Sequence, residues 1–350
     1  MPKRLAITGP RRAEVIEYQD NPPGPHWVRV RTEIASGKHG TMMAPYRRSG
    51  PTHTYLNEEM RIFLPCADER SWGWGPKEGE PFNTGTFGVG IVEEIGPEVT
   101  RFKVGDRVFG FMDIRETNHC YEYDCFAVGD IPVEDALCIE PSYVSFHCIR
   151  EGNVRIGDEV AVIGLGALGM IAVKMAVLAG AARVFAIDPI ALRREWCLKN
   201  GATAAFDPKA VDAGLEVHKL TDGKGVDVAI ETAGSSPALH SAIRCTRMCG
   251  TVVSAGFYQD EGNGLMLGQE WHHNRLTMVV PHGCGGGHVP RDYPVWDWRR
   301  ANEAIVNMMR SRRLTLPGLI NPIVSLEEGP ATLGQIDQHP EQCIKFAVKF

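Results

Sequence analysis

The chain has 350 residues, of which 43% are hydrophobic and 23% are charged, and its net charge is −6 at pH 7. This length favours two domains, and the negative charge without a long basic run excludes nucleic acid and an anionic membrane surface as expected partners. The longest apolar stretch falls short of the ~20 residues that span a bilayer, and we expect no signal peptide. Without one, the ten cysteines indicate reduced thiols and a cytoplasmic protein.

The first 150 residues contain short β-type segments separated by glycine and proline. Residues 27–32 alternate in polarity like a strand with one exposed face, and residues 88–96 and 107–111 are expected strands with glycine bends. We therefore expect a compact β-barrel. Within it, residues 47–84 form a long loop that carries aromatic residues among polar ones, which is typical of a lid or of a binding loop for sugars. Tryptophans that simply pack on the barrel are the alternative.

Residues 158–188 (DEVAVIGLGALGMIAVKMAVLAGAARVFAID) predict a strand, a glycine turn, a helix and a second strand that ends at Asp188. The glycine spacing permits a tight turn, close approach of a pyrophosphate and close packing of the helix on the strand, and the helix N-terminus attracts phosphate. The expected cofactor-binding residues of this turn are Gly164, Leu165, Gly166, Ala167, Leu168 and Gly169.

Asp188 is expected to accept hydrogen bonds from the ribose hydroxyls of an adenosine, which favours NAD over NADP because a 2′-phosphate would meet a like charge. Arg193 is also an expected cofactor-binding residue. Together with Arg194, it would weaken the discrimination against NADP. An ordinary buried β-α-β unit with incidental glycines is the alternative.

The rest of the chain completes an α/β domain. Expected strands cover residues 226–231, 251–255 and 276–280, and expected helices cover residues 238–249 and 298–312. His272 and His273 are adjacent, and because neighbouring residues of a strand point to opposite faces, at most one of them is expected to face a site. Residues 320–350 return to strand character.

Four segments carry a family resemblance: residues 88–111 (GVGIVEEIGPEVTRFKVGDRVFGF), 139–169 (IEPSYVSFHCIREGNVRIGDEVAVIGLGALG), 225–235 (GVDVAIETAGS) and 250–257 (GTVVSAGF). Together they resemble the medium-chain dehydrogenase/reductase superfamily, which contains the zinc-type alcohol and polyol dehydrogenases. The resemblance implies a GroES-like β-barrel catalytic domain in residues 1–150, completed by residues 316–350, and a Rossmann NAD-binding domain in residues 151–315. It also implies an active site in the cleft between them and a homodimer or homotetramer.

The zinc-binding motifs of that superfamily are altered here. The counterpart of its C-G-[ST]-D motif is residues 39–42 (HGTM), and the counterpart of G-H-E is residues 85–87 (GTF). Thr86 and Phe87 cannot replace an imidazole and a carboxylate as ligands. Glu140 matches a carboxylate that approaches the metal in polyol dehydrogenases. We expect no catalytic zinc, and because no C-x-x-C occurs we expect no structural zinc.

Another group must then take the alcohol proton. The expected catalytic residues are His39, since imidazole changes charge near neutral pH, Thr41, which matches the relay hydroxyl of zinc enzymes, and Glu140. A structural role for His39 stays open, and His147 is expected to be structural.

The resulting hypothesis is an NAD-dependent oxidoreductase that interconverts a secondary alcohol, on a polyol, sugar or related small polar molecule, with its ketone. One alternative is a zinc-independent NAD(P)H quinone or enone reductase, against which Asp188 argues because that branch usually prefers NADPH. The other is a dinucleotide-binding protein without catalysis.

Overall fold

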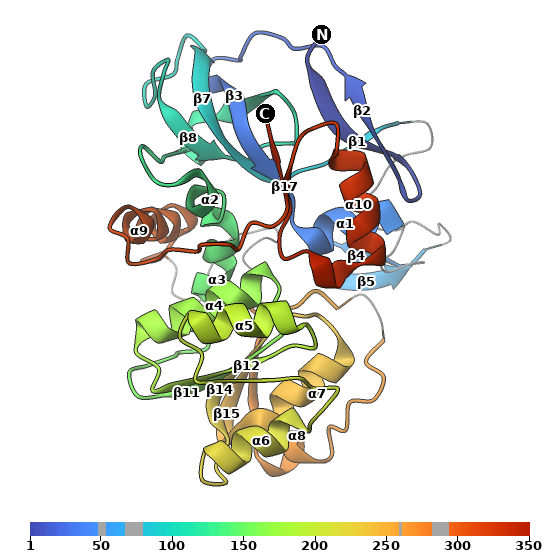
Figure 1. The fold of residues 1–350 in the computed structure, drawn as a ribbon, viewed down its shortest axis with the longest axis vertical. Helices are drawn as coiled ribbons and strands as arrows, with labels where there is room; N and C mark the ends of the chain where they lie inside the picture. The colour runs from blue at the N-terminus through green and yellow to red at the C-terminus, as the bar shows by residue number, and fades with distance from the viewer. Residues whose placement is uncertain (48–53, 67–79, 259–260, 282–293) are drawn as a thin grey trace. The chain divides into compact units, whose positions relative to one another are not determined.

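The computed structural model describes residues 1–47, 54–66, 80–258, 261–281 and 294–350 (Figure 1). Two compact units divide the chain, the first formed by Met1–Leu137 with Ile320–Phe350 and the second by Cys138–Leu319. The boundary between the two units lies earlier than the expected residue 150. Helix α3 (Ile139–Glu151) belongs to the second unit, where Ser145 donates a hydrogen bond of 2.8 Å to the carbonyl oxygen of Leu168. In the described residues, no helix has the length and apolar character needed to cross a membrane.

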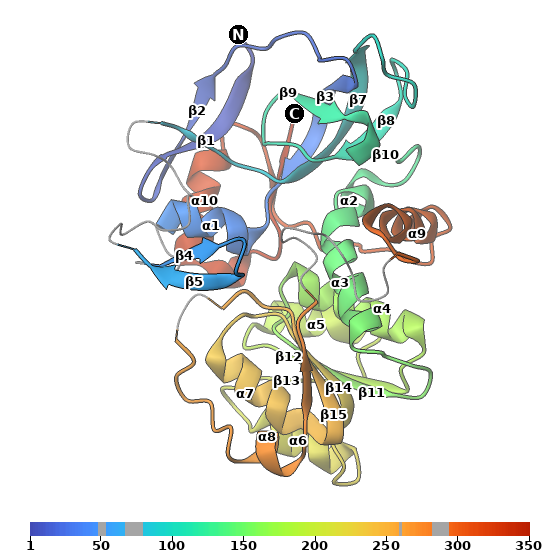
Figure 2. The same ribbon diagram turned by 180° about the vertical axis from the view of Figure 1, so that it is seen from behind.

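The first unit is built mainly from antiparallel strands. Its seven-stranded sheet has the order β10-β8-β7-β3-β18-β17, with β9 paired to β3, and Figure 2 shows β9 and β10 beside β3 and β8. A second sheet has the order β2-β1-β6, and β4 and β5 form a hairpin. The strands are β1 (Lys3–Gly9), β2 (Arg12–Glu17), β3 (Trp27–Ser36), β4 (Thr54–Asn57), β5 (Ile62–Pro65), β6 (Phe82–Asn83), β7 (Phe87–Ile95), β8 (Arg107–Gly110), β9 (Thr117–Tyr121), β10 (Phe126–Ala127), β17 (Ile323–Val324) and β18 (Ala347–Lys349).

The alternation of polar and apolar residues in β3 sets the core under this sheet. Val28 and Val30 point inward and pack with Val92 of β7 and Val108 of β8 in one buried cluster. The three strands expected for this region therefore all form, and β7 brings Phe87 to the same register level as Ser36.

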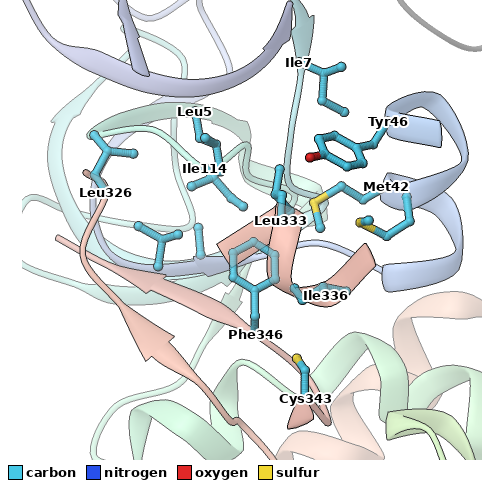
Figure 3. Close-up of a cluster of buried hydrophobic side chains, with 13 residues drawn as sticks. Leu5, Ile7, Met42, Tyr46, Ile114, Leu326, Leu333, Ile336, Cys343 and Phe346 are labelled. Atoms are coloured by element: carbon cyan, nitrogen blue, oxygen red, sulfur yellow. The ribbon is translucent and has the colours of Figure 1, made fainter. Parts of the chain in front are cut away.

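The first unit also contains helices α1 (His39–Arg47), α2 (Val133–Ala136) and α10 (Gly329–Gln338). The expectation of strand character throughout residues 320–350 is wrong for α10. Its buried residues recur at the three- and four-residue spacing of a helix rather than at the two-residue spacing of a strand. Figure 3 shows Leu333 and Ile336 of this helix packed with Met42 and Tyr46 of α1 and with Phe346. This cluster fixes the start of α1 next to the segment that leads into β18.

The second unit is a parallel six-stranded sheet of order β13-β12-β11-β14-β15-β16, with α4 and α5 on one face and α6 and α7 on the other (Figure 1). Its elements are β11 (Glu159–Ile163), α4 (Ala167–Ala179), β12 (Arg183–Ile187), α5 (Ala191–Lys199), β13 (Ala204–Phe206), α6 (Ala213–Leu220), β14 (Val226–Glu231), α7 (Ser236–Cys245), β15 (Thr246–Ser254), α8 (Glu270–His273), β16 (Thr277–Val279) and α9 (Trp298–Arg310).

Two details of this unit correct the sequence analysis. The helix expected over residues 238–249 ends at Cys245, because Thr246 is already extended and pairs in parallel with Val226. His272 and His273 lie in the short helix α8 rather than in a strand, and both are exposed. The opposite-face argument therefore does not apply to them.

The expectation of a long loop over residues 47–84 is wrong for its described part, which contains the paired strands β4 and β5 and the strand β6. Trp72 and Trp74 of that segment lie outside the described residues.

Candidate functional site

The glycine turn joins β11 to α4 as the sequence predicts. Gly164 has a φ of +86°, and a Cβ there would lie 2.7 Å from the backbone nitrogen of Ala233, so no other residue fits without strain. A Cβ on Gly169 would overlap the carbonyl oxygen of Gly164. Gly166, the N-cap of α4, is different: among the described residues, no atom beyond its own chain neighbours lies within 4 Å of its Cβ position, and no side chain caps the helix. Open space therefore adjoins the uncapped end of a long helix, which fits a pyrophosphate.

Asp188 follows β12 and is tied to this turn. Its Oδ2 accepts a hydrogen bond of 2.7 Å from the backbone N–H of Leu165, and its Oδ1 accepts one of 2.7 Å from Ile190. The side chain is 5% exposed, and Arg193 Nη1 lies 3.8 Å from Oδ2. Each carboxylate oxygen has two acceptor positions, so these bonds leave capacity for ribose hydroxyls. The same carboxylate thus orients the glycine turn and presents charge beside it.

Arg194 is turned away from the carboxylate. Its Nη1 donates to the carbonyl oxygen of Asp188 at 2.6 Å and lies 3.4 Å from Asp207 Oδ2. Arg193 therefore lies nearer to the Asp188 carboxylate than Arg194 does. A site with one buried carboxylate and one nearby guanidinium fits a ribose that carries free hydroxyls.

A buried network that sequence reasoning missed lies at the carboxyl ends of β14 and β15. Glu231 accepts hydrogen bonds from Gly234 N at 2.8 Å and from the Tyr258 hydroxyl, and Ser254 Oγ donates to that hydroxyl at 3.1 Å. Burial raises the pKa of Glu231. Burial and the bond to Glu231 raise the pKa of Tyr258. The network ties together the loops that follow β14 and β15, and the signal for it in the sequence was the acid that ends a buried strand.

His39 is the first residue of α1, and Thr41 lies in the same turn; both are half-exposed. The backbone N–H of Phe346 donates to His39 Nε2 at 3.1 Å. A nitrogen that accepts a hydrogen bond carries no proton, so this bond assigns the ring proton to Nδ1. Glu140 is buried in the first turn of α3, in the second unit. The structure therefore places His39 and Thr41 together on one helix turn and Glu140 on a helix of the other unit.

Thr86 and Phe87, which stand at the positions of two zinc ligands of the superfamily, make contacts of a different kind. Thr86 Oγ1 donates to the carbonyl oxygen of Gly85 at 2.8 Å, and Phe87 is fully buried. The ammonium Nζ of Lys345, itself buried, lies 4.6 Å from the centre of the Phe87 ring. A nearby positive charge and the two non-ligating side chains do not fit a divalent cation. Across the part of the chain that the structure describes, no group of three or more His, Cys, Asp or Glu residues is placed to hold a metal.

The cysteines that follow β8 and precede β11 are buried and divided between the two units. A hydrogen bond with Cys125, together with burial, raises the pKa of Cys120 well above its usual value. Burial raises the pKa of Cys148 to about 12. Cys120 and Cys125 pack in the apolar core of the first unit, whereas Cys148 lies in helix α3 of the second, so the described residues do not bring four cysteines together.

Comparison with known proteins gives matches to two family models, the alcohol dehydrogenase GroES-like domain over residues 66–182 and the zinc-binding dehydrogenase over residues 167–298. The D-guloside 3-dehydrogenase of Escherichia coli strain K12 is 34% identical over 354 residues, which cover 99% of this chain and 100% of that protein. The D-xylulose reductase A of Aspergillus oryzae is 25% identical over 73% of this chain and 78% of that protein.

Two solved structures share the fold over nearly their whole length. The 2R,3R-butanediol dehydrogenase from Bacillus subtilis has a TM-score of 0.77 and 19% identity, with 100% of both chains covered. The galactitol-1-phosphate dehydrogenase from Escherichia coli has a TM-score of 0.79 and 18% identity, with 99% of this chain and 100% of that chain covered.

Proposed function

Because this chain belongs to the medium-chain dehydrogenase/reductase superfamily, in its zinc-type alcohol dehydrogenase-like branch, we propose that it oxidises a secondary alcohol with NAD and without catalytic zinc. Membership confirms the predicted fold class, a GroES-like domain with a Rossmann domain, and the assignment to alcohol dehydrogenase-like enzymes. The choice of NAD, the absence of zinc and the catalytic residues are our proposals.

The observation that carries the cofactor proposal is the geometry of Asp188. Its carboxylate is held against the glycine turn by Leu165 N, beside the open space at Gly166. A ribose with a free 2′-hydroxyl would donate to this carboxylate, whereas a 2′-phosphate would place like charges together in a site with little solvent. Arg193 offsets part of that repulsion, so we propose a preference for NAD rather than absolute exclusion of NADP.

The proposed substrate is a polyol, a sugar or a glycoside. Two relatives with long aligned regions bear the names D-guloside 3-dehydrogenase and D-xylulose reductase A, and both names specify polyhydroxylated substrates. We propose that this chain acts on a secondary hydroxyl of such a molecule, with its hydride passing to the nicotinamide and its proton to the protein.

His39 and Thr41 are the residues that we propose to hold the reacting oxygen. The Nε2 atom of His39 accepts the backbone N–H of Phe346. To act as a base through Nε2, the ring would have to release that bond. We therefore propose that His39 orients the oxygen, and that Thr41 and Glu140 take part in moving its proton toward solvent.

The test is turnover across a panel of polyols, sugars, glycosides and quinones, with NAD and NADP compared in each case. We expect NAD-linked oxidation of at least one polyhydroxylated alcohol and a lower kcat/KM with NADP. Turnover of quinones alone with NADPH would identify the reductase alternative. Tight NADH binding with no turnover on the panel would identify a dinucleotide-binding protein.

A further inference from the structure

The buried network of Glu231 has no role yet in the proposed reaction. Glu231 ends β14, is fully buried and pairs in the sheet with Ser254, which ends β15. Ser254 Oγ donates a hydrogen bond of 3.1 Å to the Tyr258 hydroxyl, and that hydroxyl donates in turn to Glu231 Oε2. A chain of hydrogen bonds that ends on a carboxylate polarises each of its members and is stronger than bonds between neutral groups. Burying an acid costs free energy, so this arrangement calls for an explanation.

The same carboxylate holds the loop that leads into α7. Glu231 Oε1 accepts the backbone N–H of Gly234 at 2.8 Å, and the N–H groups of Ala233 and Ser235 also lie close enough to stabilise its charge. Ser235 is the N-cap of α7, and its own side chain does not cap the helix. Glu231 therefore satisfies N–H groups at this helix start that a capping side chain would otherwise bind.

The loops that follow β14 and β15 are in direct backbone contact. The main-chain carbonyl oxygen of Glu231 accepts the N–H groups of Ala255 at 2.8 Å and of Gly256 at 3.1 Å. Gly234 has a φ of +72°, and a Cβ on Gly256 would lie 2.2 Å from the nitrogen of Gly234. Only glycine permits so close an approach, so the two loops pack as one piece.

This piece also contacts the glycine turn that we assign to the pyrophosphate. Thr232 Oγ1 donates a hydrogen bond of 2.6 Å to the carbonyl oxygen of Gly164, and its N–H donates one of 2.9 Å to Ile163. A Cβ on Gly164 would lie 2.7 Å from Ala233. The turn after β11 and the loop after β14 are therefore neighbours within the second unit.

The topology of the sheet places a ligand at this junction. From β11 the chain runs outward through β12 and β13 and then returns to β14 on the other side of β11. Ligands of open α/β sheets bind at the carboxyl ends of the strands where the strand order reverses in this way, and a dinucleotide lies across that point. With its adenosine on the side of Asp188 and β12, NAD would have its nicotinamide half on the side of β14 and β15.

We propose that Tyr258 is a positioning residue for the nicotinamide half of NAD. This inference rests on the proposed function. Through Glu231, the Tyr258 hydroxyl holds the backbone of residues 233–235 in one place, so that the nicotinamide ring binds in one orientation. Hydride transfer depends on that orientation, because a displacement of about 1 Å lowers a rate by about 10²-fold. The adenosine half, held by Asp188 and the glycine turn, does not depend on the Tyr258 hydroxyl.

The test compares Tyr258→Phe with the matched control Ser241→Ala, which removes a hydroxyl that donates to the Pro237 carbonyl within α7. Phenylalanine keeps the ring that packs against the hydrophobic cluster of this unit. Without the hydroxyl, only a fraction of the molecules have the loop in place, and the apparent affinity falls by that fraction. We expect the Kd for NADH to rise about tenfold, the factor of one charge-assisted hydrogen bond, and kcat to fall about 10- to 100-fold.

Binding of 5′-AMP separates positioning of the nicotinamide from damage to the whole site, because this ligand carries only the adenosine half. Its Kd should be unchanged in Tyr258→Phe. The emission of bound NADH comes from the reduced nicotinamide, so its anisotropy at saturation should fall in this variant. Ser241→Ala should match wild type in all of these measurements.

An unchanged Kd for NADH with unchanged emission in Tyr258→Phe would overturn the proposal, and so would an equal weakening of NADH and 5′-AMP. If Tyr258→Phe does not fold, Ser254→Ala carries the test, since it removes the donor to the Tyr258 hydroxyl. We expect smaller changes in the same direction from it, and wild-type binding and emission would refute the inference. If wild type binds neither NADH nor 5′-AMP, the proposed function itself fails, and this inference fails with it.

Discussion

Replacing Asp188 by asparagine tests the cofactor site with little change in shape. The carboxylate accepts two backbone hydrogen bonds of 2.7 Å each, from Leu165 and Ile190, and is almost fully buried. An asparagine keeps one oxygen acceptor and turns the other into a donor, so one buried N–H loses its partner. An unsatisfied buried group costs about 1–3 kcal/mol, and we expect a loss of stability of that size.

The same substitution should weaken cofactor binding by a larger factor. A hydrogen bond from ribose to a charged acceptor contributes about 1.5–3 kcal/mol, which corresponds to a rise in the Kd for NADH of about 10- to 150-fold. NADPH should lose less, because removal of the charge also removes repulsion of its 2′-phosphate. Fluorescence titration with both cofactors and a thermal unfolding curve measure these effects.

Asp207→Asn is the matched control. It removes a half-exposed carboxylate that lies 3.4 Å from Arg194 at the same edge of the sheet, and it should change neither Kd by more than a few-fold. The reasoning is refuted if Asp188→Asn binds NADH as tightly as wild type and keeps the same ratio of NADH to NADPH affinity.

Four other substitutions test the glycine turn, the Glu231 network and the exposure of one cysteine. Gly166→Ala should fold normally but bind NADH weakly, because its Cβ enters open space, whereas Gly169→Ala should lose about 1–3 kcal/mol of stability through overlap with the Gly164 carbonyl; equal unfolding curves would contradict this. Burial raises the pKa of Glu231 above 4.5, so its folded form binds more protons than its unfolded form and wild type should lose stability relative to Glu231→Gln as pH rises through the raised pKa. Thermal unfolding across that range should show the two curves diverging, and parallel curves would refute the shift. Cys249→Ser should remove one equivalent from the fast phase of thiol labelling, because Cys249 is exposed whereas burial raises the pKa of Cys245 to about 12; an unchanged fast phase would show that Cys249 is protected.

The glycine turn and the elements around it could be predicted from the sequence, because the signals for them are local. The strand, turn, helix and strand of residues 158–188 each depend on neighbouring residues, and all four form where they were expected. The end of α7 was placed four residues late, because pairing of Thr246 with Val226 of β14 overrides a run that reads as helix.

The surroundings of the proposed catalytic residues could not be predicted from the sequence, because they depend on contacts between distant parts of the chain. Lys345 lies in a segment that the sequence predicts as strand, and its side chain is buried where it binds the Gly37 carbonyl, 308 residues away in the chain. The bond from Phe346 to His39 involves a backbone N–H and leaves no trace in the side-chain pattern. Helix α10, which packs with α1 and Phe346, was not predicted because it contains residues of weak helix propensity such as Gly329 and Thr332.

The reaction that we propose for this protein is alcohol oxidation by NAD without a metal. The most direct measurement is kcat with NAD and the best polyhydroxylated alcohol, on protein dialysed against a zinc chelator, with the zinc content of the same sample determined by mass spectrometry. We predict that kcat is unchanged when zinc falls far below one atom per chain, and that added zinc does not raise it. Loss of activity in step with zinc, and its recovery when zinc is restored, would contradict the account.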